Sequence, residues 1–226
     1  MFKPCMAVLP PAQKHLWPQL ANAAPLGFTL YGGTAIALRL GHRFSVDFDF
    51  FSDQPLNRQA LHAALPWLAR ATTVQDDGNA WTVLADGAAA GGDGTDETVK
   101  VSFFGAIQFG RVGEPSFTDD GVLRVASLDD LLATKVKVVL QRAEAKDYRD
   151  VAAMVSGGVS LSRALASARL LYGPNFQPSE SMKALVYFND GDLPTLSTAE
   201  KQTLVDAVKA VRDLPDVALR SRSIGV

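Results

Sequence analysis

The sequence predicts an α+β (α/β-type) protein, in which a mixed or antiparallel sheet flanked by helices is followed by a helical C-terminal region. Two observations lead to this prediction. Short apolar or alternating segments typical of strands lie in the first 125 residues, and helix-like spacing with capping residues fills the remainder. We therefore expect an α/β core at residues 1–125 and a helical subdomain at residues 126–226 that contributes residues to the functional site.

The composition is that of an ordinary globular protein. Of the 226 residues, 47% are hydrophobic and 20% are charged. The single cysteine, Cys5, excludes internal disulfides and cysteine-based zinc sites and fits a reducing compartment. No apolar segment is long enough for a signal peptide or a membrane span, so we expect a cytoplasmic protein with no membrane partner. The net charge of −2 argues against a generally basic surface, so any RNA contact would have to be a local patch.

Turn residues and apolar spacing divide the first half into short elements. Pro18 and Pro66 should interrupt two of the helices. A segment rich in glycine, alanine and aspartate, residues 85–97, is expected to be a mobile loop. The expected helices span residues 16–23, 35–40 and 58–70, and the expected strands span residues 26–31, 44–51, 72–75, 81–84, 98–104 and 122–125.

Helix caps define the second half. Ser127 is expected to cap a helix that runs to residue 143. Ser197 and Glu200 form a capping box for the last helix, which Pro215 closes after residue 214. Three further helices are expected at residues 147–155, 160–171 and 181–188.

The most informative stretch is residues 31–51, which reads YGGTAIALRLGHRFSVDFDFF. A glycine pair ends the preceding strand, and the short helix that follows stops at Gly41, a favourable residue for a helix end. The final segment alternates with period two, so that two sets of side chains point to opposite faces. One set is Phe44, Val46, Phe48 and Phe50, and the other is Ser45, Asp47, Asp49 and Phe51.

Asp47 and Asp49 therefore share one face of a strand, where like charges repel each other. A divalent cation removes this penalty, since Mg²⁺ binds one or two carboxylates together with phosphate oxygens. The turn Gly32-Gly33-Thr34 leads into a helix N-terminus, whose free N–H groups favour a phosphate. The stretch thus offers a phosphate cradle beside a pair of metal ligands. The alternative is an edge strand with a solvated acidic face after a tight glycine turn.

The glycine turn, the short helix and the Asp-x-Asp strand resemble the first motif of the AbiEii/AbiGii-type nucleotidyltransferases, a branch of the DNA polymerase β-like superfamily. GGT and DFD fill this motif, the intervening RLGHRFS is close to the AbiEii form, and a looser resemblance continues to about residue 155. The resemblance implies a nucleotidyltransferase-like fold and Mg²⁺-dependent transfer of a nucleotide from an NTP to an acceptor. Toxins of this family act on tRNA, which makes tRNA a candidate acceptor and a cognate antitoxin a candidate partner.

Lys135 is the sharpest single-residue signal outside this stretch. On the expected helix it falls within the apolar stripe, one turn after Leu131 and one turn before Val139. A lysine that faces the core needs a partner or a ligand, and a triphosphate or the Asp47/Asp49 pair would serve. The alternative is a lysine at the edge of the stripe that extends to solvent. AbiEii-type proteins have a helix lysine at this place, which favours a catalytic Lys135.

Residues 146–150, KDYRD, match the Lys-Asp-x-x-Asp motif of the same family. On a helix, Asp147 and Asp150 share a face. The resemblance favours Asp147 as a catalytic carboxylate and Lys146 as a nucleotide contact. Alternatively, Asp147 is an N-cap and Asp150 a solvated charge, or Asp150 holds Lys135 or Lys146 in place.

Arg39 and Arg43 lie between the glycine turn and the acidic strand. Their guanidinium groups suit phosphate or base contacts in a nucleotide site. Equally, either side chain can pair with Asp47 or Asp49 when no metal is bound.

One departure from the superfamily pattern concerns a third carboxylate, which such transferases commonly place on a later strand beside the first pair. The strand TVKVSFF has Ser102 at that position, and serine is neither an ionised ligand nor a base at neutral pH. Either Asp147 supplies the third carboxylate, or the metal site is reduced, or the protein is a catalytically weak relative. The main alternative to a transferase is therefore a catalytically inactive nucleotide-binding or partner-binding protein of the same fold.

Overall fold

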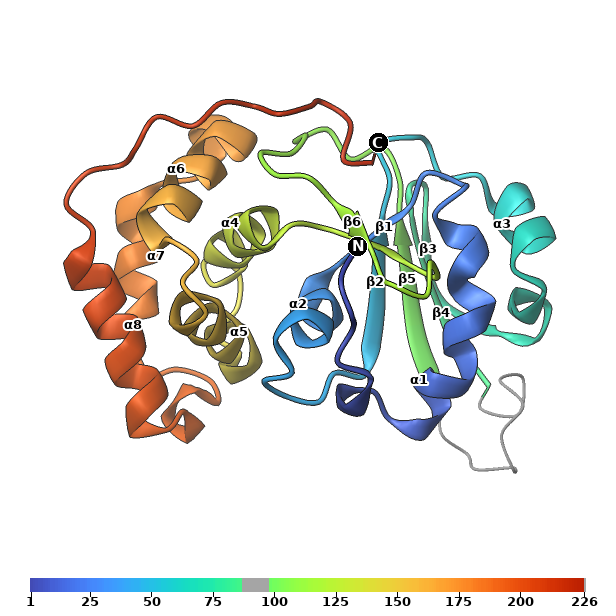
Figure 1. Cartoon of the computed structure of the whole chain (residues 1–226), viewed down its shortest axis with the longest axis horizontal. Coiled ribbons are helices and arrows are strands. Elements are labelled where there is room, and N and C mark those ends of the chain that lie inside the picture. The colour runs from blue at the N-terminus through green and yellow to red at the C-terminus, as the bar shows by residue number, and fades with distance from the viewer. Residues whose placement is uncertain (87–97, 226) are drawn as a thin grey trace. The chain divides into compact units, whose positions relative to one another are not determined.

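A computed structural model describes residues 1–86 and 98–225 of the chain (Figure 1). The loop expected at residues 85–97 falls, beyond its first two residues, outside the described residues. The chain forms two compact units. Unit 1 comprises residues 1–110, 115–126 and 223–226, and unit 2 comprises residues 111–114 and 127–222.

Unit 1 is built on a sheet of seven described strands in the order β3-β4-β5-β2-β1-β7-β6. β2 pairs antiparallel with β1 and parallel with β5, and β1 pairs parallel with β7. The prediction of a mixed sheet is confirmed, and the acidic strand β2 is its central strand. The strands are β1 (Thr29–Tyr31), β2 (Asp47–Phe51), β3 (Thr72–Asp77), β4 (Ala80–Ala85), β5 (Val99–Phe104), β6 (Ser116–Phe117) and β7 (Arg124–Val125).

Helices cover both faces of this sheet, with α2 on one side and α1 and α3 on the other (Figure 1). Pro18 and Pro66 each lie in the first turn of a 3₁₀ segment, so the expected interruptions occur at these prolines. The helices of unit 1 are α1 (Pro11–Leu16), α2 (Gly32–Leu40) and α3 (Arg58–Ala64), with 3₁₀ segments at Met6–Val8, Trp17–Ala23 and Pro66–Arg70.

The period-two pattern of the acidic strand is confirmed for residues 47–51. Phe48 and Phe50 are buried at 0% and 1% exposure, and Phe50 stacks on Phe103 of β5 with 5.4 Å between ring centroids. Asp47 and Asp49, on the opposite face, are partly exposed. One face of β2 therefore belongs to the aromatic core of unit 1, and the other carries the carboxylates.

The strand begins at Asp47, three residues later than the expected start at residue 44. Phe44 and Val46, which were expected on the same face as the core phenylalanines, are 71% and 60% exposed. The pairing of β2 with β5 begins at Asp47 and its pairing with β1 begins at Asp49, so the preceding residues have no strand partner in the described chain. Without that partner they are not covered by the core.

The predicted end of α2 at Gly41 is confirmed. Gly41 has a left-handed φ of 66°, and its N–H donates to the Ala37 carbonyl. This conformation is favourable for glycine because a Cβ would be strained there. The helix begins at Gly32, earlier than expected, so the glycine turn itself forms its first turn.

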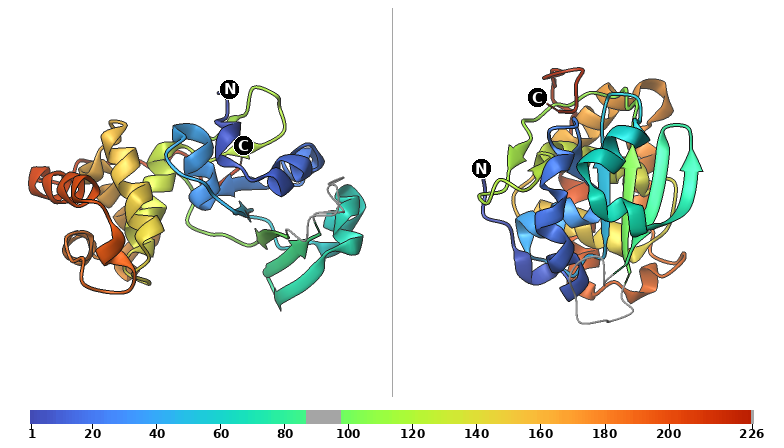
Figure 2. Two further views of the ribbon diagram at one scale, coloured as in Figure 1. Left: turned by 90° about the horizontal axis from the view of Figure 1, so that it is seen from below. Right: turned by 90° about the vertical axis from the view of Figure 1, so that its right-hand side faces the viewer.

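Unit 2 is helical, as expected for the second half of the chain. α4 packs against α5 and α6, and α5 packs against α8 (Figure 2). Ser127 caps α4 by accepting from the Asp130 N–H, and Ser197 with Glu200 forms the predicted capping box of α8. The helices are α4 (Leu128–Val138), α5 (Ala145–Ser156), α6 (Leu161–Tyr172), α7 (Pro178–Leu185) and α8 (Thr198–Ala210), with 3₁₀ turns at Gly173–Asn175 and Leu193–Thr195.

Two of these helices are shorter than predicted. α4 ends at Val138 rather than at residue 143, because the chain turns there and Arg142 bonds back to Asp147 of α5. α8 ends at Ala210 rather than at residue 214, and Val211 is already extended ahead of Pro215. None of the described helices is long and apolar enough to cross a membrane.

Candidate active site

The carboxylate face of β2 is the centre of the candidate site. Asp47 and Asp49 stand on the same face, two residues apart, and both are partly exposed. The Asp47 carboxylate makes no hydrogen bond or ion pair with the rest of the described chain. Two neighbouring carboxylates that are open to solvent suit a divalent cation, which would relieve their mutual repulsion.

Gly32 lies directly against this pair. A Cβ built on Gly32 would collide with Asp49 Oδ2, and its φ of +72° is in the left-handed region, so glycine is required for both reasons. Gly32 is also the first residue of α2, whose first N–H groups have no intrahelical acceptor. The open N-terminus of the helix therefore lies beside the carboxylates, where it favours an anionic group such as a phosphate.

We expect Gly32→Ala to lower both stability and transfer. The left-handed φ costs about 1–2 kcal/mol for a residue with a Cβ, and the collision displaces the Asp49 carboxylate. Gly121→Ala is the matched control, since Gly121 has a φ of +73° with nothing within 4 Å of its Cβ position. Denaturation should show the cost of the left-handed φ for both variants, with a larger loss for Gly32→Ala because of the collision, whereas transfer should fall only for Gly32→Ala. Equal transfer by the two variants would contradict this role of Gly32.

Thr34, expected to bind a phosphate, has a different role for its hydroxyl. The residue is 1% exposed, and its Oγ1 lies 2.7 Å from Ser45 Oγ and donates to the backbone carbonyl of Asp47. The hydroxyl therefore joins α2 to the start of β2 and positions Asp47. Of the Thr34 polar groups, the backbone N–H in the first turn of α2 is the one that suits a phosphate.

Arg39 is likewise used for packing, so the expectation of a phosphate contact is not supported. Its Nε donates to the Ala126 carbonyl at 2.9 Å. Its Nη2 donates to the Val125 carbonyl and to Ser116 Oγ, both at 3.0 Å. The guanidinium also lies 4.3 Å from the centroid of the Phe2 ring. Burial lowers the pKa of Arg39 to about 10. These contacts tie α2 to the β6–β7 edge of the sheet.

Arg43 remains a candidate contact of the site. It is partly exposed in the segment between α2 and β2, and its Nη1 donates to the Phe44 carbonyl at 2.8 Å. The alternative ion pair with Asp47 does not occur, because the Asp47 carboxylate has no partner in the described chain.

Ser102 occupies the place beside the acidic pair, as predicted. The parallel register of β2 and β5 sets Ser102 directly opposite Asp49. Ser102 is 2% exposed, and its hydroxyl accepts a hydrogen bond from Thr82 Oγ1 at 3.1 Å. The described residues contain no group of three or more His, Cys, Asp or Glu side chains that could hold a metal ion. A cation on this face would therefore draw its further ligands from substrate and water.

The same register reveals a residue that sequence reasoning did not select as a candidate. Lys100 of β5 is directly opposite Asp47, and registered neighbours of adjacent strands point to the same face. The lysine is exposed. When the strand DFDFF is set beside KVSFF in parallel, Lys100 falls opposite Asp47. The sequence alone does not show that these two strands pair in parallel.

Unit 2 holds a second, buried charged cluster. Lys135 Nζ lies 2.5 Å from Asp147 Oδ1 and 2.7 Å from Asp150 Oδ2. The side chain of Lys135 is 7% exposed, and both carboxylates are fully buried. The prediction that Lys135 faces the core is confirmed, and its partners are the two aspartates of α5. The expected alternative in which Asp150 holds Lys135 is therefore correct.

Asp147 is bound from two sides. Arg142 Nε donates to Asp147 Oδ2 at 2.8 Å, and Arg142 Nη2 donates to Asp147 Oδ1 at 3.2 Å. Burial alone would raise the pKa of Asp147, but Arg142 and Lys135 outweigh it and hold the pKa below its ordinary value. Glu144, not Asp147, is the N-cap of α5, so the N-cap alternative is wrong. Because both oxygens are engaged, the structure does not support Asp147 as a base.

Lys146 points to the surface of unit 2. Its side chain is 47% exposed, and its Nζ forms an ion pair with Glu144 Oε2 at 2.8 Å. Its expected contact with a nucleotide stays a prediction.

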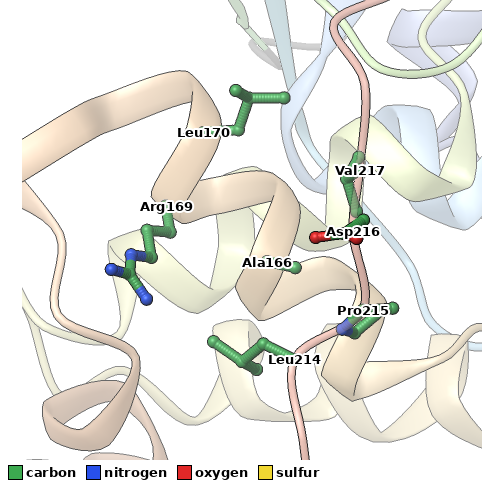
Figure 3. Close-up of a pocket in the computed structure, with 7 residues that line it drawn as sticks. All are labelled: Ala166, Arg169, Leu170, Leu214, Pro215, Asp216 and Val217. Carbon is green, nitrogen blue, oxygen red and sulfur yellow. The ribbon is translucent and has the colours of Figure 1, made fainter.

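A pocket on unit 2 lies between α6 and the segment that follows α8 (Figure 3). Its lining combines apolar side chains with one arginine and one aspartate, and it contains none of the predicted site residues. The lining residues are Ala166, Arg169, Leu170, Leu214, Pro215, Asp216 and Val217.

Comparisons with known proteins identify the family and the fold. The family model of the AbiEii toxin, a nucleotidyl transferase of type IV toxin–antitoxin systems, matches residues 20–217. An uncharacterised protein of Aquifex aeolicus (strain VF5), aq_aa25, is 30% identical over 166 residues, which cover 72% of this chain and 74% of the relative. MenT4, a nucleotidyltransferase toxin of Mycobacterium tuberculosis H37Rv, has a similar fold, with a TM-score of 0.51 and 16% identity over 89% of this chain and 91% of MenT4. The predicted nucleotidyltransferase fold is thus confirmed, and the chain belongs to the AbiEii family of nucleotidyltransferase toxins.

Proposed function

We propose that this nucleotidyltransferase uses Mg²⁺ to transfer a nucleotide from an NTP to an acceptor hydroxyl, with tRNA as the favoured acceptor. The observation that carries the proposal is the placement of Asp47 and Asp49 on one solvent-accessible face of β2, against the glycine-rich N-terminus of α2.

The residues on this face suit a magnesium ion. Asp47 and Asp49 provide hard oxygen ligands, and Mg²⁺ typically completes its shell with substrate phosphates and water. When bound, the ion would neutralise phosphate oxygens and make the α-phosphorus easier to attack. The close fit of Gly32 against Asp49 holds one of the two carboxylates in place.

The protein's own groups would bind and orient the triphosphate. The N–H groups of Gly32, Gly33 and Thr34 in the first turn of α2 can donate to phosphate oxygens. In the reaction, the acceptor hydroxyl loses its proton, its oxygen bonds to the α-phosphorus, and pyrophosphate departs. Positioning and electrostatic stabilisation account for most of the catalysis in such transfers.

For unit 2, the resemblance to AbiEii-type proteins supports our proposal that Lys135 is a catalytic residue. Asp147 and Asp150 then act as positioning residues, because both hold the Lys135 amine. Arg142, whose side chain is 45% exposed, adds positive charge at the edge of the same cluster. Lys146 and Arg43 are further candidate contacts for the nucleotide.

The family and the charge of the chain bear on the acceptor and the partner. The family description, a toxin of a type IV toxin–antitoxin system, favours a cognate antitoxin as the partner. The resemblance favours tRNA as the acceptor. The overall charge of −2 means that RNA would be bound through a local group of basic side chains rather than through a generally basic surface. The single cysteine suits work in the reducing cytoplasm, where NTPs and tRNA occur.

The proposal is tested by following two labels. Purified protein is mixed with Mg²⁺, total tRNA and each NTP, labelled either on the α- or on the γ-phosphate. Nucleotide transfer should place the α-label on RNA and release the γ-label as pyrophosphate. Appearance of the γ-label on RNA would indicate phosphoryl transfer instead and would refute the proposal.

A further inference from the structure

Lys100 stands on the carboxylate face without a partner in the described chain. It is the registered neighbour of Asp47 across the parallel β2/β5 pair, and its other neighbour, on β4, is Leu84. It is exposed, and it forms no ion pair within the described residues, even with the adjacent Asp47. The Lys100 amine is therefore not bound by the carboxylates beside it.

The charges on this face differ from those of a site with three carboxylates. Asp47 and Asp49 contribute two negative charges, and Lys100 contributes one positive charge. The position beside Asp49 holds the neutral Ser102, whose hydroxyl is bonded to Thr82. A triphosphate carries more negative charge than one divalent cation can balance, so a second cationic group on this face would be favourable.

We propose that Lys100 is a phosphate-binding residue that contacts the triphosphate of the NTP. The inference rests on the proposed function, because it assigns Lys100 to the same nucleotide site. A lysine ammonium is a compact charge on a flexible stem, which suits a phosphate chain that also binds a metal ion. Its place opposite Asp47 sets it at the same end of the sheet as the open carboxylate.

Equilibrium binding without an acceptor tests this directly. ATP, GTP, CTP and UTP, and the four matching monophosphates, are titrated into the full-length wild type and into Lys100→Met with Mg²⁺ present. We expect Lys100→Met to weaken triphosphate binding about tenfold, as for the loss of a charge-assisted contact, and monophosphate binding less than about twofold. Lys100→Arg should retain most of the triphosphate affinity, because it keeps the positive charge.

Lys14→Met is the matched control, since Lys14 is an exposed lysine of α1 on the other side of the sheet (Figure 1). It should leave binding unchanged. Equal losses for triphosphates and monophosphates in Lys100→Met, or no loss for either, would overturn the proposal.

Lys100 could also bind the phosphates of an RNA backbone. Filter binding of total tRNA to the wild type and to Lys100→Met distinguishes this ligand from the NTP. If Lys100→Met loses tRNA binding tenfold but binds NTPs as the wild type does, the assignment of Lys100 to the triphosphate is overturned. If the wild type binds NTPs through Lys100 but transfers no label, the proposed function fails while this inference stands. If the wild type binds no NTP at all, both fail.

Discussion

Asp47→Asn should abolish nucleotide transfer while leaving the fold intact. Asn has nearly the same shape as Asp but lacks the charge that a metal ligand needs. Loss of the contact between the Asp47 carboxylate and the metal ion removes several kcal/mol of transition-state stabilisation, so the rate should fall about 10³-fold or more. Because Asp47 is partly exposed and its carboxylate has no partner in the described chain, the unfolding free energy should change little. Single-turnover release of pyrophosphate measures the rate.

The control for this prediction is Asp119→Asn, which removes one exposed carboxylate elsewhere in unit 1. It should leave the rate unchanged. Binding of Mn²⁺, followed by electron paramagnetic resonance, should weaken for Asp47→Asn and not for Asp119→Asn. If Asp47→Asn releases pyrophosphate at the wild-type rate, the two-carboxylate mechanism is wrong.

Lys135→Met should destabilise the protein by about 3–5 kcal/mol, because it removes the buried ammonium that lies between two buried carboxylates. Asp147 keeps its bonds to Arg142, but Asp150 loses the Lys135 ammonium that lies 2.7 Å from its Oδ2. Urea denaturation at neutral pH measures this loss. A loss below about 1 kcal/mol would show that the cluster does not behave as a buried ion network.

Two further variants separate charge from packing. Lys137→Met, on the same helix, removes a lysine whose ammonium lies 4.8 Å from the Tyr172 ring centroid, and it should cost only about 0.5–1 kcal/mol. The double variant Lys135→Met/Asp150→Leu removes the lysine together with one carboxylate. It should recover most of the stability lost in Lys135→Met, because apolar replacements of a buried pair are often nearly neutral.

The cluster also predicts a dependence of stability on pH. The pKa of Asp147 is lower in the folded protein than its ordinary value of 3.8. Its stabilising contribution is therefore fully present above about pH 3.8 and is lost as the pH falls through the lower, folded value. Asp147→Asn should be less stable than the wild type at neutral pH. In acid denaturation below pH 3.8, it should not show the loss of stability that the wild type shows when Asp147 is protonated.

Local features of the structure could be predicted well because they depend on neighbouring residues. The glycine at the end of α2, the Ser127 cap and the Ser197–Glu200 capping box are each determined within a few residues of the chain. The alternation along β2 likewise places the two carboxylates on one face. These features, together with the family motif, were sufficient to identify the fold and the acidic pair.

The remaining details depend on contacts between residues far apart in the chain. Thr34 and Arg39 have side chains that suit phosphate. In the structure, however, Thr34 donates to the backbone of β2, and Arg39 donates to β6 and β7. Lys100 reaches the carboxylate face only through the parallel pairing of β2 with β5. The partners of Lys135 depend on how α5 packs against α4, which helical periodicity alone does not specify.

The most direct test of the catalytic face is transfer of α-labelled nucleotide to RNA by the wild type and Asp47→Asn, assayed side by side with Mg²⁺ and each NTP. We expect label on RNA with the wild type and none with Asp47→Asn. Equal labelling by the two proteins would contradict the role of the β2 carboxylates. Persistent NTP binding by the wild type, with no label on RNA, on protein or on the enzyme itself, would contradict the proposed transfer and favour a nucleotide-binding role instead.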